Sequence, residues 1–396
     1  MEESGSTSAE EVARSRDTLS AILFRLPPKP LIQLKLVSKG WLILISDYRF
    51  RRSHYLRHNP AALLLSNKYG PLPRSHILSF TTTTATIRDL DLDFLTNHIF
   101  RAKRVDTVVC SCNGVLLCRS ATSHFICNPT TRTFTTLTLP KQRSKNNQEC
   151  AFYLAFDPST SPHYEIVLLR IWGGVKPPFR CVFSVYSSKT RSWRDSASGV
   201  SFNAQFRLND ANGVYSNRAI HWFNKAAELS GDCTGGMYFD IDARCLKELP
   251  MPLFDDSESE SVNRNVKYFG ESGGCLQLII GIKETLKFDV FELKEDYSAW
   301  SLIHSVNLNP TRVKFPELSH WDMPNSVVPF YIARPSEEKN SVLVLIVGGG
   351  AAVLLYDPVD RTSRKLCDLK PGTINVDLAT GNVLGEVFQY FEYSSC

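Results

Sequence analysis

The stretch Asp17–Ser46, DTLSAILFRLPPKPLIQLKLVSKGWLILIS, concentrates aliphatic side chains in a segment that prolines and cations interrupt. Its first apolar residues recur at i, i+3, i+4 and i+7, the spacing of one face of a helix. They are Leu19, Ile22, Leu23 and Leu26. Pro27 and Pro28 should end that helix, because proline lacks the amide N–H and disfavours helical angles in the residue before it.

Further short helices are predicted directly after these prolines. Pro30 suits the first turn of a second helix, which would carry Leu31, Leu34 and Leu36. A third helix is predicted from the apolar spacing of Val37, Trp41, Leu44, Ile45 and Tyr48. The next segment, Asp47–His58, also reads as helical, with Ser46 or Asp47 as its cap. A module this small has more apolar surface than its own core can bury. The rest of the chain or a partner must therefore cover the remainder.

The composition indicates a reduced, intracellular protein with a large core. The 396 residues are 43% hydrophobic, yet no apolar run is long enough for a membrane helix and no signal peptide is visible. The eleven cysteines form no CxxC pair, and no histidine cluster has zinc-ligand spacing. We therefore expect free thiols, no metal, no cofactor, no contact with a membrane, and a location in the cytoplasm and/or the nucleus.

Positive charge gathers near the N-terminus. The segment Arg25–Arg57 holds eight Lys and Arg residues and one acid, Asp47, a net charge of +7 within a chain total of +5. A basic helical module suits nucleic acid or an acidic protein partner. Because the sequence shows neither RNA-binding motifs nor a recognition helix, we expect no nucleic acid and favour the acidic protein.

After Asn59-Pro60 the pattern changes from helical to repeated β-hairpins. Val108–Arg119 predicts two strands joined at Asn113-Gly114, the pair that a two-residue hairpin turn prefers. Similar strand–turn–strand units follow, at Phe125–Phe134, Phe183–Trp193, Tyr238–Leu249, Phe288–Leu302 and Val353–Leu366. Their turns are about 53 to 64 residues apart, in the range of β-propeller blades stretched by loop insertions.

The predicted fold is therefore a small helical module followed by a β-propeller-like domain of about six blades, with a large β-sandwich as the alternative. Apolar runs ahead of the units would supply the inner strands, and Val383–Phe391 could close the ring by pairing with an early strand. The predicted divisions are a disordered tail (1–13), the helical module (14–58), a linker with a degenerate first blade (59–104) and the propeller-like domain (105–391).

Two sets of motifs resemble a known family. The string from Leu19 to Phe50, with LPPKPL, VSKGW and LISD in order, resembles the F-box, although Arg14-Ser15 stands where many F-boxes have Leu-Pro. The motifs SCNGVLLC, NPTTRTF and VYSSKTRSWR resemble the F-box-associated domain of plant F-box proteins. The resemblance implies an SCF-type ubiquitin ligase subunit, with a Skp-type adaptor, through it cullin and a RING subunit, and a protein substrate as partners.

The resemblance also implies which residues contact the Skp-type adaptor. The matching positions are Leu19, Ile22, Leu23, Leu26, Pro27, Leu31, Leu34, Val37, Ser38, Trp41 and Ile45. An aliphatic face with an aromatic anchor and a basic rim suits docking of an acidic protein. The alternative is a stand-alone propeller that binds protein or glycan, with helices that merely pack on it.

No catalytic centre is expected. The tempting polar residues are Asp157, Asp240, Asp242, Asp289, Asp357 and His221. Asp at the end of a strand commonly accepts backbone N–H bonds in a turn, and His221 beside Trp222 reads as a core residue. Substrate contacts are expected in long inserts, with Trp172 and Trp321 as possible aromatic anchors. These inserts are 141–149, 171–179, 229–236, 255–265 and 308–325.

Overall fold

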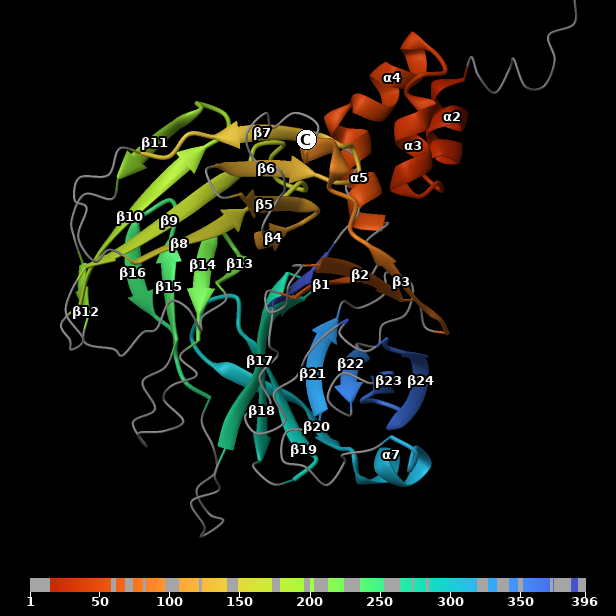
Figure 1. The fold of residues 1–396 in the computed structure, drawn as a ribbon, viewed down its shortest axis with the longest axis vertical. Helices are drawn as coiled ribbons and strands as arrows, with labels where there is room; N and C mark the ends of the chain where they lie inside the picture. The colour runs from red at the N-terminus through yellow and green to blue at the C-terminus, as the bar shows by residue number, and fades with distance from the viewer. Residues whose placement is uncertain are drawn as a thin grey trace, which may run out of the picture.

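The protein folds as a cluster of short helices followed by a ring of small β-sheets (Figure 1). The computed structural model describes residues 15–57, 62–67, 74–80, 83–96, 107–120, 123–140, 149–172, 179–195, 200–202, 213–223, 236–252, 264–272, 274–282, 285–318, 327–332, 342–347, 352–370, 373 and 386–390. None of the helices in these ranges is long and apolar enough to cross a membrane.

Four helices build the N-terminal module. They are α2 (Arg16–Leu23), α3 (Pro28–Leu34), α4 (Lys39–Ser46) and α5 (Tyr48–Arg57). Pro28, rather than the predicted Pro30, is the first residue of α3, because Pro27 already has the extended angles of an N-cap. The predicted cap of α5 is confirmed at Asp47, whose carboxylate accepts the backbone N–H groups of Arg49 and Phe50 at 2.9 and 3.1 Å.

The β-domain consists of six antiparallel sheets, which we number as blades 1 to 6. Blade 1 contains β1 (Ala62–Asn67), β2 (Arg74–Phe80), β3 (Ala85–Asp89) and β25 (Glu386–Gln389). Blade 2 contains β4 (Thr107–Cys112), β5 (Val115–Arg119), β6 (His124–Asn128) and β7 (Thr133–Leu137). Blade 3 contains β8 (Glu149–Ala155), β9 (Glu165–Trp172), β10 (Phe179–Ser187), β11 (Ser192–Asp195) and the added β12 (Val200–Phe202).

The second half of the ring repeats this order. Blade 4 contains β13 (Val214–Ser216), β14 (Ala219–Trp222), β15 (Met237–Asp240) and β16 (Cys245–Glu248). Blade 5 contains β17 (Arg264–Ser272), β18 (Cys275–Ile282), β19 (Lys287–Leu293) and β20 (Trp300–Asn307). Blade 6 contains β21 (Val327–Ile332), β22 (Val342–Val347), β23 (Ala352–Asp357) and β24 (Thr362–Asp368). Two short helices, α6 (Asp93–Thr96) and α7 (Asn309–Lys314), lie between blades.

The sheets are arranged around an axis, which confirms the propeller and its six blades. The first strands of neighbouring blades contact one another, β4 with β8, β8 with β13, β13 with β17 and β17 with β21. The predicted ring closure is confirmed as well, because β25 pairs with β1 and also contacts β4. The β-sandwich alternative is therefore wrong, since two packed sheets would not produce this circular order.

The hairpin turns follow the predicted chemistry. Asn113 and Gly114 have φ of 47° and 84°, the left-handed angles that a two-residue turn requires. Between the last two strands of blade 2, the Asn128 side chain accepts the N–H groups of Thr130 and Thr131 at 2.9 and 3.2 Å. Arg132 ends that turn with φ of 56°, and arginines at 191, 244 and 361 repeat this angle in blades 3, 4 and 6.

Hydrophobic cores lie between neighbouring blades rather than in one central mass. Phe183 of blade 3 stacks on Phe239 of blade 4, with ring centroids 4.2 Å apart. Two tryptophans also join blades through their indole N–H groups. Trp193 donates to the Thr138 carbonyl and Trp300 to the Pro250 carbonyl, each at 2.7 Å. The β-domain therefore has its own packing, and the helical module has a separate core.

Candidate docking surface on the helical module

The helical module buries one set of aliphatic residues and exposes another. Its core consists of Leu19, Leu23, Leu31, Leu44, Ile45 and Phe50, with Phe24, Leu26, Leu34 and Trp41 packed at the edge. The helix α5 is held against α2 by aromatic contacts, since Phe24 meets Phe50 and His54 edge-on at 5.8 and 6.0 Å. The ring of His54 also hydrogen-bonds the Leu26 carbonyl at 2.7 Å. The module is therefore a packed unit without help from the outer aliphatic residues.

The outer residues form what we call the exposed aliphatic surface, composed of Ile22, Leu36, Val37, Leu42 and Ile43. Leu36 is 89% exposed, Ile43 65% and Val37 58%. Four of the five lie within eight residues of sequence, in the turn after α3 and on the outer side of α4. Large exposed aliphatic side chains grouped in so short a stretch are typical of an interaction surface.

The eleven predicted adaptor-contact residues range from fully buried to exposed. Leu19, Leu23, Leu31 and Ile45 lie in the core, so they support the surface from beneath. Leu26, Leu34 and Trp41 are half-buried, and Ile22, Pro27, Val37 and Ser38 are exposed. Sequence reasoning missed Leu36, Leu42 and Ile43 as contact residues. Leu36 is predicted on the second helix, but α3 ends at Leu34 and leaves it exposed in the turn, while Leu42 and Ile43 lie on the side of α4 away from the core.

Local hydrogen bonds fix the two helices that carry this surface. The Ser38 hydroxyl accepts the Trp41 N–H at 3.2 Å and so caps α4. At the start of α2, the Ser15 hydroxyl accepts the Thr18 N–H at 3.3 Å. Ser15, the second of the two residues that stand where many F-boxes have Leu-Pro, thus serves as a helix cap.

The charge around the surface is positive. Arg25 and Lys39 are exposed, and Lys35 lies in the turn between α3 and α4. Burial, and then the nearby Arg51 guanidinium, lower the pKa of the Lys35 ammonium. Because a nearby carboxylate would relieve this repulsion, the rim favours an acidic partner.

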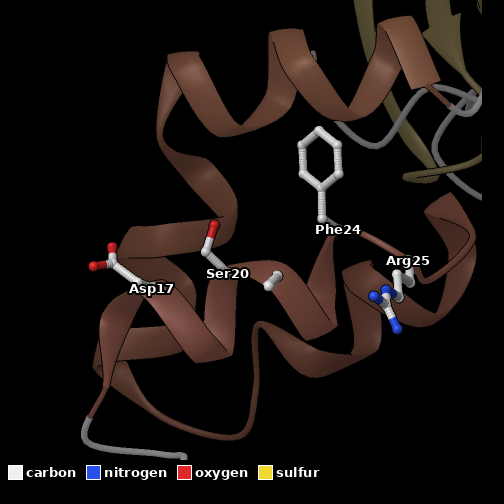
Figure 2. Close-up of a pocket in the computed structure, with 5 residues that line it drawn as sticks. Asp17, Ser20, Phe24 and Arg25 are labelled. Carbon is white, nitrogen blue, oxygen red and sulfur yellow. The ribbon is translucent and has the colours of Figure 1, made fainter.

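A separate hollow of about 360 Å³ lies along α2 (Figure 2). Its walls are Asp17, Ser20, Ala21, Phe24 and Arg25, and Figure 2 shows Phe24 pointing toward the neighbouring helix. None of the predicted contact residues lines it, so the exposed aliphatic surface and this hollow are different features.

In the β-domain, three of the aspartates predicted to act in turns do so, whereas the prediction is wrong for Asp289, which lies within β19 and accepts the Ser305 hydroxyl at 2.7 Å. Asp157 accepts the Ser159 N–H at 2.8 Å, Asp240 the Ala243 N–H at 2.8 Å, and Asp357 the Val359 N–H at 2.8 Å. His221 is fully buried, which confirms its interpretation as a core residue. Trp172 is the last residue of β9, whereas Trp321 lies outside the described residues, as do most of the long inserts.

The inner strands bring ionisable groups to one end of the ring. Burial raises the pKa of the Cys112 thiol well above its ordinary value, and also that of the Tyr215 phenol. Burial likewise raises the pKa of the Glu271 carboxyl to about 7. Because Cys112 and Tyr215 keep their protons at neutral pH, neither is a nucleophile there. Among the described residues, no three His, Cys, Asp or Glu side chains are placed to hold a metal ion.

Comparison with protein families agrees with both parts of the chain. The model of the F-box domain matches residues 15–53, and the model of the F-box associated beta propeller domain matches residues 78–353. The chain is an F-box protein with an F-box-associated β-propeller. An F-box protein of Arabidopsis thaliana is 28% identical to this chain over 92% of this chain and 88% of its own length. A putative F-box/kelch-repeat protein of the same plant is 24% identical over 64% of each chain.

Solved structures add little to this assignment. An oligogalacturonate lyase in complex with manganese covers 83% of this F-box protein and 85% of its own chain, at 9% identity and a TM-score of 0.44. A likeness at that level says nothing about chemistry. F-box proteins are generally non-catalytic adaptors, and the F-box with a propeller indicates an F-box substrate adaptor.

Proposed function

We propose that this F-box protein is the substrate-recognition subunit of an SCF-type ubiquitin ligase in the cytoplasm and/or the nucleus. The F-box would dock a Skp-type adaptor, and through it cullin and the RING subunit, while the propeller would recruit a target protein. The observation that carries the proposal is the exposed aliphatic surface, because it lies within the residues that match the F-box.

Large aliphatic residues that a helical module leaves in water are available for a partner to bury. Leu36, Val37 and Ile43 contribute nothing to the module's own core, and each stabilises a complex by about 1.5–3 kcal/mol when a partner buries it fully. The half-buried Trp41 at the edge of the core is the type of residue that often dominates binding energy. The basic rim would orient an acidic adaptor.

In such a complex the chain supplies proximity rather than chemistry. The reactive thioester belongs to the ubiquitin-conjugating enzyme, and ubiquitin passes from it to a lysine of the target. Holding both on one assembly raises their effective concentration, which accelerates the transfer without any catalytic side chain in this chain.

The test replaces exposed residues, because Leu26 and Trp41 pack on the core and their substitution would also weaken folding. We expect Val37→Asp combined with Ile43→Asp to reduce capture of a Skp-type adaptor at least about tenfold, since buried unpaired carboxylates oppose docking. Leu302→Asp is the matched control, because Leu302 is 56% exposed on β20 of the propeller.

The measurement is co-purification of the adaptor with the full chain, with circular dichroism to show that all variants fold. Undiminished capture by the double variant would remove the exposed aliphatic surface as the docking site. If the unaltered protein captures neither adaptor nor cullin, the chain is a stand-alone binding propeller.

A further inference from the structure

A second hollow lies in the propeller, between blades 3 and 4, with a volume of about 170 Å³. Ligand pockets usually measure about 300–1,000 Å³. A hollow this small accommodates one side chain or the end of a chain, but not a whole peptide segment. Its position on the propeller separates it from the F-box and from the hollow along α2.

Blade 3 forms one wall from a single face of its sheet. The register pairs Val185 with Arg194 and Ser187 with Ser192 on the neighbouring strands β10 and β11. Because side chains alternate along a strand, these four share a face. Val185 is buried, while Arg194, Ser187 and Ser192 line the hollow beside it, and the Ser192 hydroxyl is hydrogen-bonded to the Thr190 hydroxyl at 2.8 Å.

Blade 4 forms the opposite wall from the turn between β15 and β16. Asp240 holds this turn by accepting the N–H groups of Asp242 and Ala243 at 3.1 and 2.8 Å. Ile241 is buried and faces the base of the hollow, and Arg244 lines it from the end of the turn. The two walls thus give an aliphatic base with an arginine on each side.

The charged side chains around the hollow differ in whether they have an ion-pair partner. Arg218 donates to Glu165 at 2.7 Å and to Asp242 at 2.6 and 3.2 Å, so one guanidinium serves both carboxylates that line the hollow. Within the described ranges, Arg194 and Arg244 make no ion pair. The three arginines and two carboxylates leave a net charge of +1.

We propose that this hollow binds a carboxylate of the protein that the propeller recruits. The inference rests on the proposed function and names the chemistry that substrate recognition would use. Arg194 and Arg244 would donate to the carboxylate oxygens, Val185 and Ile241 would contact its aliphatic stem, and the serine hydroxyls would bond neighbouring amides. A single negative charge matches the net charge of +1, whereas a dianionic phosphate would exceed it and would face Glu165 and Asp242.

The carboxylate has two possible sources, a chain terminus or the side chain of Asp or Glu. Four pools of ten-residue peptides, randomised without Asp and Glu, distinguish them. The first pool has a free carboxyl terminus, and the second is amidated. The third is amidated with one central Glu, and the fourth is amidated with one central phosphoserine. Each pool is passed over the immobilised full chain, and the retained peptides are measured by mass spectrometry.

We expect the full chain to retain the first or the third pool more than the second and the fourth. Retention of the first pool alone identifies a chain terminus, and retention of the third identifies an acidic side chain. Arg194→Gln with Arg244→Gln should reduce this retention about tenfold or more, the loss expected for hydrogen bonds to charged groups. The matched control is Arg361→Gln, which changes the arginine at the same turn position of blade 6.

The double variant should still capture the Skp-type adaptor, because both arginines lie on the propeller surface. Adaptor capture without any preference for the carboxylate pools overturns this proposal and leaves the ligase role standing. Preference for the phosphoserine pool, or equal retention by the double variant, also overturns it.

Discussion

At the scale of single residues, His221 shows how a propeller uses a polar side chain as a core residue. Its Nδ1 donates to the Val214 carbonyl at 3.1 Å, so Nε2 accepts the hydroxyl of Tyr297 at 2.7 Å. Tyr297 belongs to blade 5, and its φ of 61° is a left-handed angle that a bulky residue rarely adopts. The bond therefore joins blades 4 and 5 and helps to hold an unfavourable turn.

This arrangement predicts a pH-dependent stability. Burial lowers the pKa of His221 to about 4 from its ordinary value of 6.5. Between those pH values the unfolded chain binds a proton at His221 that the folded protein excludes. The contribution of the neutral His221 to the free energy of unfolding is therefore complete above pH 6.5 and is lost as the pH falls toward 4. The contribution of His221 to the free energy of unfolding should fall by up to about 3 kcal/mol over that interval. Urea unfolding at pH 7 and at pH 5 measures the effect.

The measurement requires a comparison between variants, because other groups titrate in the same interval. Glu271 has the opposite effect, because burial raises its pKa to about 7 and the folded protein holds a proton that the unfolded chain releases. The contribution of Glu271 to the free energy of unfolding therefore falls as the pH rises toward 7. His221→Gln should lower the free energy of unfolding more at pH 7 than at pH 5, so the difference between the unaltered protein and this variant should shrink as the pH falls. His163→Gln, at an exposed loop position, should leave the stability unchanged at both pH values. An unchanged pH dependence in His221→Gln would contradict the assignment.

At the scale of secondary structure, the start of α4 combines one residue that favours the helix, Ser38, with one that disfavours it, Gly40. Ser38 caps the helix, and Gly40 follows at its second residue, where a methyl group would meet only the Ser38 hydroxyl at 3.7 Å. We expect Gly40→Ala to stabilise the helix by about 0.5–1 kcal/mol, because alanine loses less backbone entropy. Ser38→Ala should destabilise it by about 1 kcal/mol through loss of the cap.

Hydrogen exchange of the α4 amides in the full chain reports both changes. Protection should rise several-fold in Gly40→Ala and fall by a similar factor in Ser38→Ala, while the propeller amides stay unchanged. Faster exchange in Gly40→Ala would contradict the prediction, because it would mean that the added methyl group disturbs a neighbour, whereas the structure has room for it.

Elements with local causes could be predicted from the sequence, and features built by distant residues could not. Asn113-Gly114 and the cap at Asp47 depend on neighbouring residues alone. The burial of Leu23 and the exposure of Ile43 depend instead on how four helices pack. The spacing of apolar residues therefore predicted that some of them would remain uncovered, but not which ones. The hollow between blades 3 and 4 combines residues from 165 to 244, and no local pattern signals it.

At the scale of the whole molecule, the ring is closed by strands from opposite ends of the domain. In the register of β25 with β1, Leu63 faces Gln389 and Leu64 faces Phe388. Tyr390 is buried and donates its N–H to the Ala62 carbonyl at 2.9 Å. Three strands of blade 1 thus come from the beginning of the β-domain and one from its end, so the closure couples every blade to the others.

We expect removal of residues 386–396 to open blade 1 and to destabilise the propeller. Loss of the buried Tyr390 removes about 1.5–3 kcal/mol, and loss of the partly buried Val387 and Phe388 removes less for each, while β1 is left with an unpaired edge. A lower midpoint in thermal unfolding is the expected result, together with self-association through β1. A synthetic peptide of residues 386–396 should restore the midpoint by pairing with β1, whereas the same peptide with Phe388 and Tyr390 replaced by Ser should not. An unaltered midpoint in the shortened chain would show that contacts among the remaining inner strands hold the ring without this closure.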